Sequence, residues 1–141
     1  MKKTNMMFAA SLAAITAFAP LAAAQNYSRP DAFLLEAMGE RGWTVSCQFD
    51  QADGDRVSTR DRGRGLHDNA RVLVGDVVSG TCSYEVPERG ALRLTMRVEH
   101  TRFECPFTIT EEGFCRAHMR AGTSGSFRIE RLAGTETGTA S

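Results

Sequence analysis

Apolar and polar residues alternate with a period of two along most of the chain after residue 42, which is the pattern of half-buried β-strands. In the run WTVSCQFD, the side chains of Trp43, Val45, Cys47 and Phe49 share one face and polar side chains share the other. Turn signals at Asp53-Gly54 and at residues 87–90 separate such runs. The pattern predicts an all-β fold of about six or seven short strands, a mostly antiparallel small sandwich or barrel. The residues expected to face the core in the later runs are Val78, Cys82, Tyr84, Val86, Leu92, Leu94, Met96, Val98, Phe103, Cys105, Phe107, Ile109, Cys115, Ala117, Met119, Phe127 and Ile129.

Two segments break this alternation. Near the N-terminus, Ser28 and Asp31 flank Pro30 in the manner of a helix start, and Gly39 and Gly42 would end the helix. The apolar stripe of this segment consists of Phe33, Leu34, Ala37 and Met38. We therefore expect one short N-terminal amphipathic helix that packs onto the sheet. The second segment, residues 50–70, has almost no apolar residues and is interpreted as a polar, solvated stretch that contains the Asp53-Gly54 turn.

The two ends of the chain predict segments outside the fold. Lys2 and Lys3, the apolar residues 6–18 and three alanines at residues 22–24 form the pattern of a signal peptide spanning residues 1–24. The apolar run is too short for a membrane span and ends at Pro20. We expect a single β-rich domain over residues 25–132, a disordered tail over residues 133–141, and a periplasmic or secreted location.

Removal of the signal peptide changes the charge composition. The remaining chain has fifteen arginines, no lysine and seventeen acidic residues, a net charge of −2 with neutral histidines. Such a balance gives no overall attraction to nucleic acid or to an anionic membrane, so neither is an expected partner.

All four cysteines, Cys47, Cys82, Cys105 and Cys115, lie after the signal peptide. An even number in an exported chain predicts two disulfides, which four cysteines can form in three ways. The economical pairing joins Cys105 to Cys115 across a hairpin and Cys47 to Cys82 between strands. No C-x-x-C motif is present, and each cysteine falls among inward-facing apolar residues, so structural disulfides are favoured over a redox or metal role.

Five arginines occupy outward positions on strands that are close in sequence: Arg93, Arg97, Arg116, Arg120 and Arg128. They could lie side by side on one sheet face. Because guanidinium groups bind carboxylates and phosphates bidentately, such a face could hold an acidic protein or an anionic envelope polymer. The alternative is an ordinary solvated face, since glutamates alternate with these arginines.

Other chemistries have weaker support. A periplasmic metal-binding protein would use His100 and His118, with Met96 as a further ligand. A small hydrolase would use His67 or His118. Yet the sequence contains no nucleophile elbow, phosphate-binding loop or dinucleotide fingerprint, so no catalytic constellation and no cofactor are predicted.

Two short segments resemble the invasion-associated locus B family of exported bacterial proteins. GWTVSC, at residues 42–47, is similar to the early W-x-V-x-C strand of that family, and residues 103–117 share a phenylalanine before a cysteine and a closing G-x-C-x-A. Cys82 lies farther along the chain than the second cysteine of that family. The resemblance implies an exported β-protein without an established catalytic site, and it transfers no functional residue.

These observations lead to one functional hypothesis. The chain is expected to be an exported, non-catalytic β-rich domain that acts by binding, as an envelope-associated or inhibitor-like protein that contacts an acidic partner.

Overall fold

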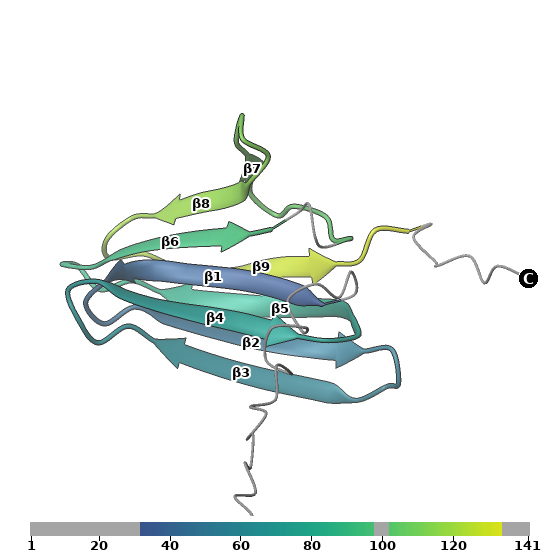
Figure 1. Ribbon diagram of the computed structural model, residues 1–141. Coiled ribbons are helices and arrows are strands. Elements are labelled where there is room, and N and C mark those ends of the chain that lie inside the picture. The colour runs from purple at the N-terminus through teal and green to yellow at the C-terminus, as the bar shows by residue number, and fades with distance from the viewer. Residues whose placement is uncertain (1–31, 98–101, 134–141) are drawn as a thin grey trace, which may run out of the picture.

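The computed structural model describes residues 32–97 and 102–133, which form two antiparallel β-sheets packed face to face (Figure 1). Sheet A has five strands in the order β4-β1-β6-β8-β7, and sheet B has four in the order β3-β2-β5-β9. The all-β prediction is confirmed. Sheet A comprises β1 (Phe33–Glu40), β4 (Asp68–Val74), β6 (Ala91–Met96), β7 (Thr108–Ile109) and β8 (Cys115–Met119). Sheet B comprises β2 (Thr44–Gln51), β3 (Arg56–Arg62), β5 (Val77–Glu85) and β9 (Ser124–Glu130).

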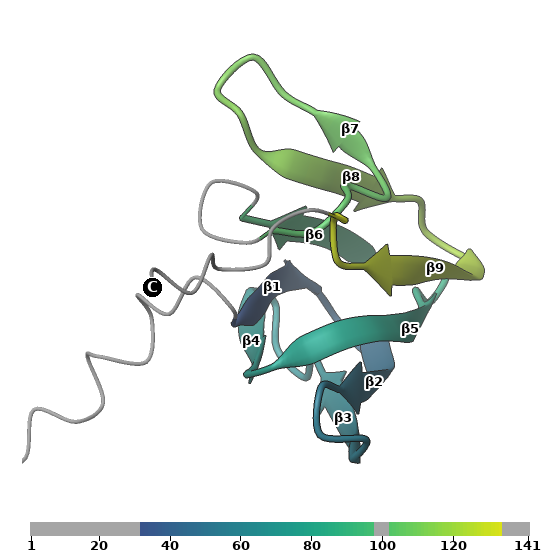
Figure 2. The ribbon, with the colours of Figure 1, turned by 90° about the vertical axis from the view of Figure 1, so that its right-hand side faces the viewer.

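The chain crosses repeatedly from one sheet to the other, and Figure 2 shows the resulting two layers. Within residues 32–97 and 102–133, only the β2–β3 and β7–β8 connections join neighbouring strands of one sheet. The crossing from β1 to β2 uses Arg41 and Gly42, both with positive φ, a backbone conformation that glycine adopts without steric cost. This crossing turns Trp43 directly into the space between the sheets, where it is fully buried.

The prediction of a helix over the stripe from Phe33 to Met38 was wrong, because these residues form β1. Phe33, Leu35 and Ala37 are fully buried, whereas the residues between them are less buried. β1 pairs with β4 on one side and β6 on the other, so its backbone hydrogen bonds are satisfied within the sheet. Tertiary pairing thus overrides the helical spacing of the apolar residues. The predicted helix start at Ser28 lies outside the described residues.

The core fills the space between the two sheets. The Phe33 ring of sheet A lies 5.1 Å, centroid to centroid, from the Phe49 ring of sheet B and 5.4 Å from Phe103. Such close aromatic pairs add stabilisation beyond the area that they bury. The inward phases predicted for residues 43–49 and 92–96 are confirmed, since Trp43, Val45, Cys47, Phe49, Leu92, Leu94 and Met96 are all buried.

Two residues predicted to face the core are exposed instead. Val78 is 43% exposed because the β2–β5 register shifts beside Asp50 and Gln51, which turns Val77 inward in its place. Ile109 is 58% exposed because the two-residue strand β7 is the outermost strand of sheet A, as Figure 2 shows. In both cases the apolar residue fits the alternating pattern of the sequence, but the sheet at that position is irregular or has no further strand to cover it.

The polar stretch of residues 50–70 contains a strand that the sequence analysis did not predict. β3 forms a hairpin with β2 around Gly54 and is an edge strand of sheet B. Its outward residues include Arg56, Ser58 and Arg60, and none of its residues is fully buried. Charged side chains on an edge strand hinder unwanted pairing with another chain. The absence of an apolar face is therefore compatible with a strand at this position.

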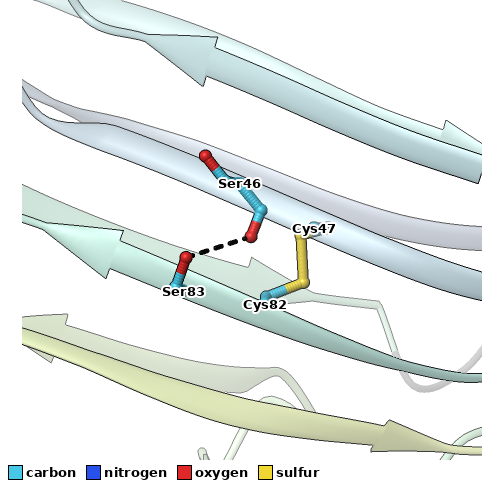
Figure 3. The surroundings of a disulfide bond; sticks show 4 residues. All are labelled: Ser46, Cys47, Cys82 and Ser83. Carbon is cyan, nitrogen blue, oxygen red and sulfur yellow. Dashed lines mark hydrogen bonds between the residues drawn. A yellow bond between two sulfur atoms is a disulfide. The ribbon is translucent and has the colours of Figure 1, made fainter.

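Both predicted disulfides are present. Cys47 and Cys82 lie directly opposite each other on β2 and β5, with their Cα atoms 4.1 Å apart and both residues in the core. Ser46 and Ser83 flank this bond on the outer side of sheet B, where the Ser83 hydroxyl donates to the Ser46 carbonyl at 3.5 Å (Figure 3). Cys105 and Cys115 close a ten-residue separation around the β7–β8 hairpin. Two such bonds are typical of an oxidising, exported environment.

Several predictions fall outside the described residues: the signal peptide, Val98, His100 and the tail beyond residue 133. The part of the chain that the structure describes includes no helix of the length and apolarity that crossing a membrane requires.

Trp43 leads to a stability prediction. A Cβ atom at Gly63 would overlap the indole nitrogen of Trp43, which is buried and fixed between the sheets. We expect Gly63→Ala to lower the free energy of unfolding by about 1–3 kcal/mol, because a packed core cannot absorb the extra atom. Gly75→Ala is the matched control, since no atom lies within 4 Å of its added Cβ. Urea unfolding of both variants measures the difference; equal stability would contradict this account of Trp43 packing.

The two disulfides should contribute unequally to stability. Replacing Cys47 and Cys82 by alanine releases a loop with a sequence separation of 35, against 10 for Cys105 and Cys115. The chain-entropy model gives losses of about 4 and about 3 kcal/mol respectively. The Cys47–Cys82 pair is also the more deeply buried, which increases the difference. Denaturant unfolding of the two double variants checks the order, and a larger loss for the hairpin disulfide would contradict it.

Candidate binding surface

The outer face of sheet A brings together most of the arginines that the sequence singled out. The strand register places Arg93 beside His118 and places Arg116 beside Thr95, so all four side chains project away from the core. Arg120 is exposed just beyond the end of β8. We call the set Arg93, Arg116, His118 and Arg120 the arginine face. The predicted outward position of His118 is confirmed.

Arg93 is held in place by its neighbour on β1. Its Nη2 atom donates to the Sδ atom of Met38 at 2.9 Å, and the two residues are cross-strand partners. Met38 is 45% exposed, so this contact lies on the outer surface. A thioether is a weak acceptor and carries no negative charge. The guanidinium group therefore keeps its full positive charge and further donors for a ligand.

Arg116 is fixed by two contacts. Its Nε atom donates to the Thr95 hydroxyl at 3.3 Å, and its guanidinium carbon lies 5.3 Å from the centroid of the Phe114 ring. Thr95 is only 6% exposed although it projects from the outer face of sheet A. Stacking on an aromatic ring and a hydrogen bond to a buried hydroxyl restrict the arginine without neutralising it.

The glutamates in the strands of sheet A lie beside other residues, and Asp68 of β4 accepts hydrogen bonds from the backbone N–H groups of Arg64 and Asn69. Glu36 contacts Arg71 with an Nε–Oε1 distance of 3.2 Å, and Glu40 lies 3.9 Å from His67. Among the described residues, no carboxylate forms an ion pair with Arg93, Arg116 or Arg120. The arginine face thus carries uncompensated positive charge, although the whole chain is nearly neutral.

The five predicted arginines do not lie on one face. Arg128 belongs to β9 in sheet B, and its Nη2 atom lies 3.1 Å from the Glu130 carboxylate. The prediction was wrong for Arg128 because the chain crosses to the other sheet between β8 and β9. Arg97 is exposed immediately after the end of β6, two positions beyond Thr95.

The structure separates Met96 from His118, two of the residues proposed as metal ligands. Met96 is buried in the core, whereas His118 projects from the opposite face of sheet A, and His100 lies outside the described residues. No cluster of three histidine, cysteine or acidic side chains suited to a metal ion occurs in residues 32–97 and 102–133. His118 is also surrounded by Arg93, Arg116 and Arg120, whose charges oppose the approach of a cation.

A hollow of about 490 Å³ adjoins the arginine face, where β1 and β8 end and β6 begins. Sequence reasoning missed it because Met38 was assigned to a helix. In the sequence, Phe33, Leu35 and Ala37 also fit a period of two, which would place Met38 on the opposite, outer face of a strand, but the helical stripe fits the same residues. The residues that line the hollow are Met38, Gly39, Glu40, His67, Ala91, Leu92, Arg93, His118 and Met119.

Comparisons with known proteins add no functional information: no family model matches the chain, and no curated protein or solved structure matches it either. The resemblance of residues 42–47 and 103–117 to the locus B family stays a prediction.

Proposed function

We propose that this protein is an exported binding domain of the periplasm or the extracellular space and that it holds an acidic partner against the arginine face. The observation that carries the proposal is the lack of carboxylate partners for Arg93, Arg116 and Arg120 among the described residues. The partner is an acidic protein segment or an anionic envelope polymer.

The geometry supports binding to an extended anionic chain. Arg93 and Arg116 lie on the adjacent strands β6 and β8, at neighbouring levels of the sheet, because Arg116 pairs with Thr95, two residues after Arg93. Diagonal cross-strand neighbours of this kind lie about 7–8 Å apart on one face. Alternate side chains of an extended ligand project from one face about 6.6 Å apart, so two acidic residues with one residue between them can reach both guanidinium groups.

The restraint of these two arginines favours recognition. A flexible surface arginine loses rotamer entropy when it is immobilised, which offsets part of its binding energy. Here the contacts to Met38, Thr95 and Phe114 already limit that freedom. Planar guanidinium groups held in this way can donate two parallel hydrogen bonds to one carboxylate.

Charge reversal on the arginine face tests the proposal. We expect Arg93→Glu combined with Arg116→Glu to weaken binding of poly-glutamate at least about tenfold, since two attractive charges become repulsive. Binding by the unmodified domain should also weaken as salt rises, because exposed charges are screened. Titration by biolayer interferometry at low and physiological ionic strength measures both effects.

Arg128→Glu is the control for this experiment, because it reverses one arginine charge on sheet B, as each of the two substitutions does on sheet A. Its binding should remain close to that of the unmodified domain. Equal loss in the Arg128 variant, or unchanged binding in the double variant, would contradict the assignment of the arginine face.

A further inference from the structure

The hollow beside the arginine face combines two kinds of surface. Its lining includes an apolar group and, next to it, the positively charged side chain of Arg93 and the imidazoles of His67 and His118. The apolar members are Met38 and Ala91, which are exposed, Met119, which is half-buried, and Leu92, which is buried. A concave apolar surface with a few polar groups at its rim is the usual form of a ligand site. A purely polar ligand would leave this apolar surface unused.

The rim of the hollow favours an anion over a cation. Met38, Arg93 and His118 are successive cross-strand neighbours, so the guanidinium group stands between the thioether and the imidazole. Among the described residues that line the hollow, the carboxylate is that of Glu40, whose Oε1 atom lies 3.9 Å from Nδ1 of His67. A soft metal ion that used the sulfur and imidazole donors would have to approach Arg93 directly, whereas a carboxylate would be attracted by it.

The register also relates the hollow to the rest of the arginine face. Arg93, at the hollow, is two residues before Thr95, which is the cross-strand partner of Arg116. An extended peptide that runs along β6 would therefore place one side chain over Arg116 and the side chain two positions away over the hollow.

We propose that the hollow takes an apolar side chain of the acidic partner, so that the preferred ligand is an extended polypeptide with an acidic residue and an apolar residue two positions apart. This inference rests on the proposed function, because the arginine face supplies the acidic half of the motif. The partner is then an unfolded or edge-strand segment of a polypeptide. An envelope polymer without apolar side chains would not bind in the hollow.

Two fluorescent peptides of equal length and charge test the inference. One repeats Glu-Ser-Leu-Ser and the other repeats Glu-Ser-Ser-Ser, so they differ only in the apolar residue two positions after each glutamate. We expect the leucine peptide to bind the full domain about tenfold more tightly by fluorescence anisotropy, as expected for partial burial of one aliphatic side chain.

The variant Met38→Gln should abolish this preference. Glutamine has nearly the length of methionine and can still accept a hydrogen bond from Arg93, but it replaces the apolar end of the Met38 side chain, which is an exposed apolar part of the lining, with a polar amide. A second variant, Ala91→Gln, fills the same hollow from an exposed position on β6. Val78→Gln is the matched control, because Val78 is a similarly exposed apolar residue, 43% against 45% for Met38, outside the hollow. It should retain the tenfold preference.

The outcomes separate the two proposals. Equal affinity for the two peptides, with both sensitive to Arg93→Glu and Arg116→Glu, would overturn the role of the hollow and leave the arginine face as the binding site. A leucine preference that survives in both Met38→Gln and Ala91→Gln would also overturn it. Failure of both peptides and of poly-glutamate to bind would overturn the proposed function itself.

Discussion

The contact between the inner faces of the two sheets determines the rest of the structure. Phe33 of β1 meets Phe49 of β2 across the sandwich, and the Cys47–Cys82 bond lies in the same buried layer. Because side chains on a strand alternate between two faces, burying one set of residues fixes which residues project outward. Leu92, Leu94 and Met96 face the core, and Arg93 and Thr95 are consequently placed on the outer surface. The arginine face is thus a consequence of core packing.

The alternation of apolar and polar residues predicted the buried faces correctly where strands are regular and flanked by turns. It identified the inward faces of β2 and β6, and it favoured the disulfide pairing that the structure contains. It failed at β1 because Phe33, Leu34, Ala37 and Met38 also fit a helical stripe. Only the pairing of β1 with both β4 and β6 decides between the two periods. No local sequence signal contains that information.

The candidate site was only partly predictable for a related reason. Alternation gives the direction of a side chain relative to its own sheet, and it correctly placed Arg93, Arg116 and His118 outward. It does not say which sheet a strand joins, and so it could not separate Arg128 from the others. The hollow depends on how the ends of three strands meet, because β1 and β8 end where β6 begins.

The arginines on the two outer faces of the sandwich differ in the contacts that hold them, and this difference supports binding on sheet A. On sheet B, Arg56 contacts Asp50 at 2.9 Å and Arg128 contacts Glu130 at 3.1 Å. Exposed pairs of this kind stabilise a fold little, but they leave less charge for a ligand. On sheet A, the contacts to Arg93 and Arg116 come from a thioether, a hydroxyl and an aromatic ring, which position a cation without cancelling it. Arginines that serve only solubility do not require side-chain contacts that restrict their rotamers. Among the described residues, arginines held by such neutral contacts on an outer face are Arg93 and Arg116 of sheet A, and this is the reason to expect an acidic ligand there.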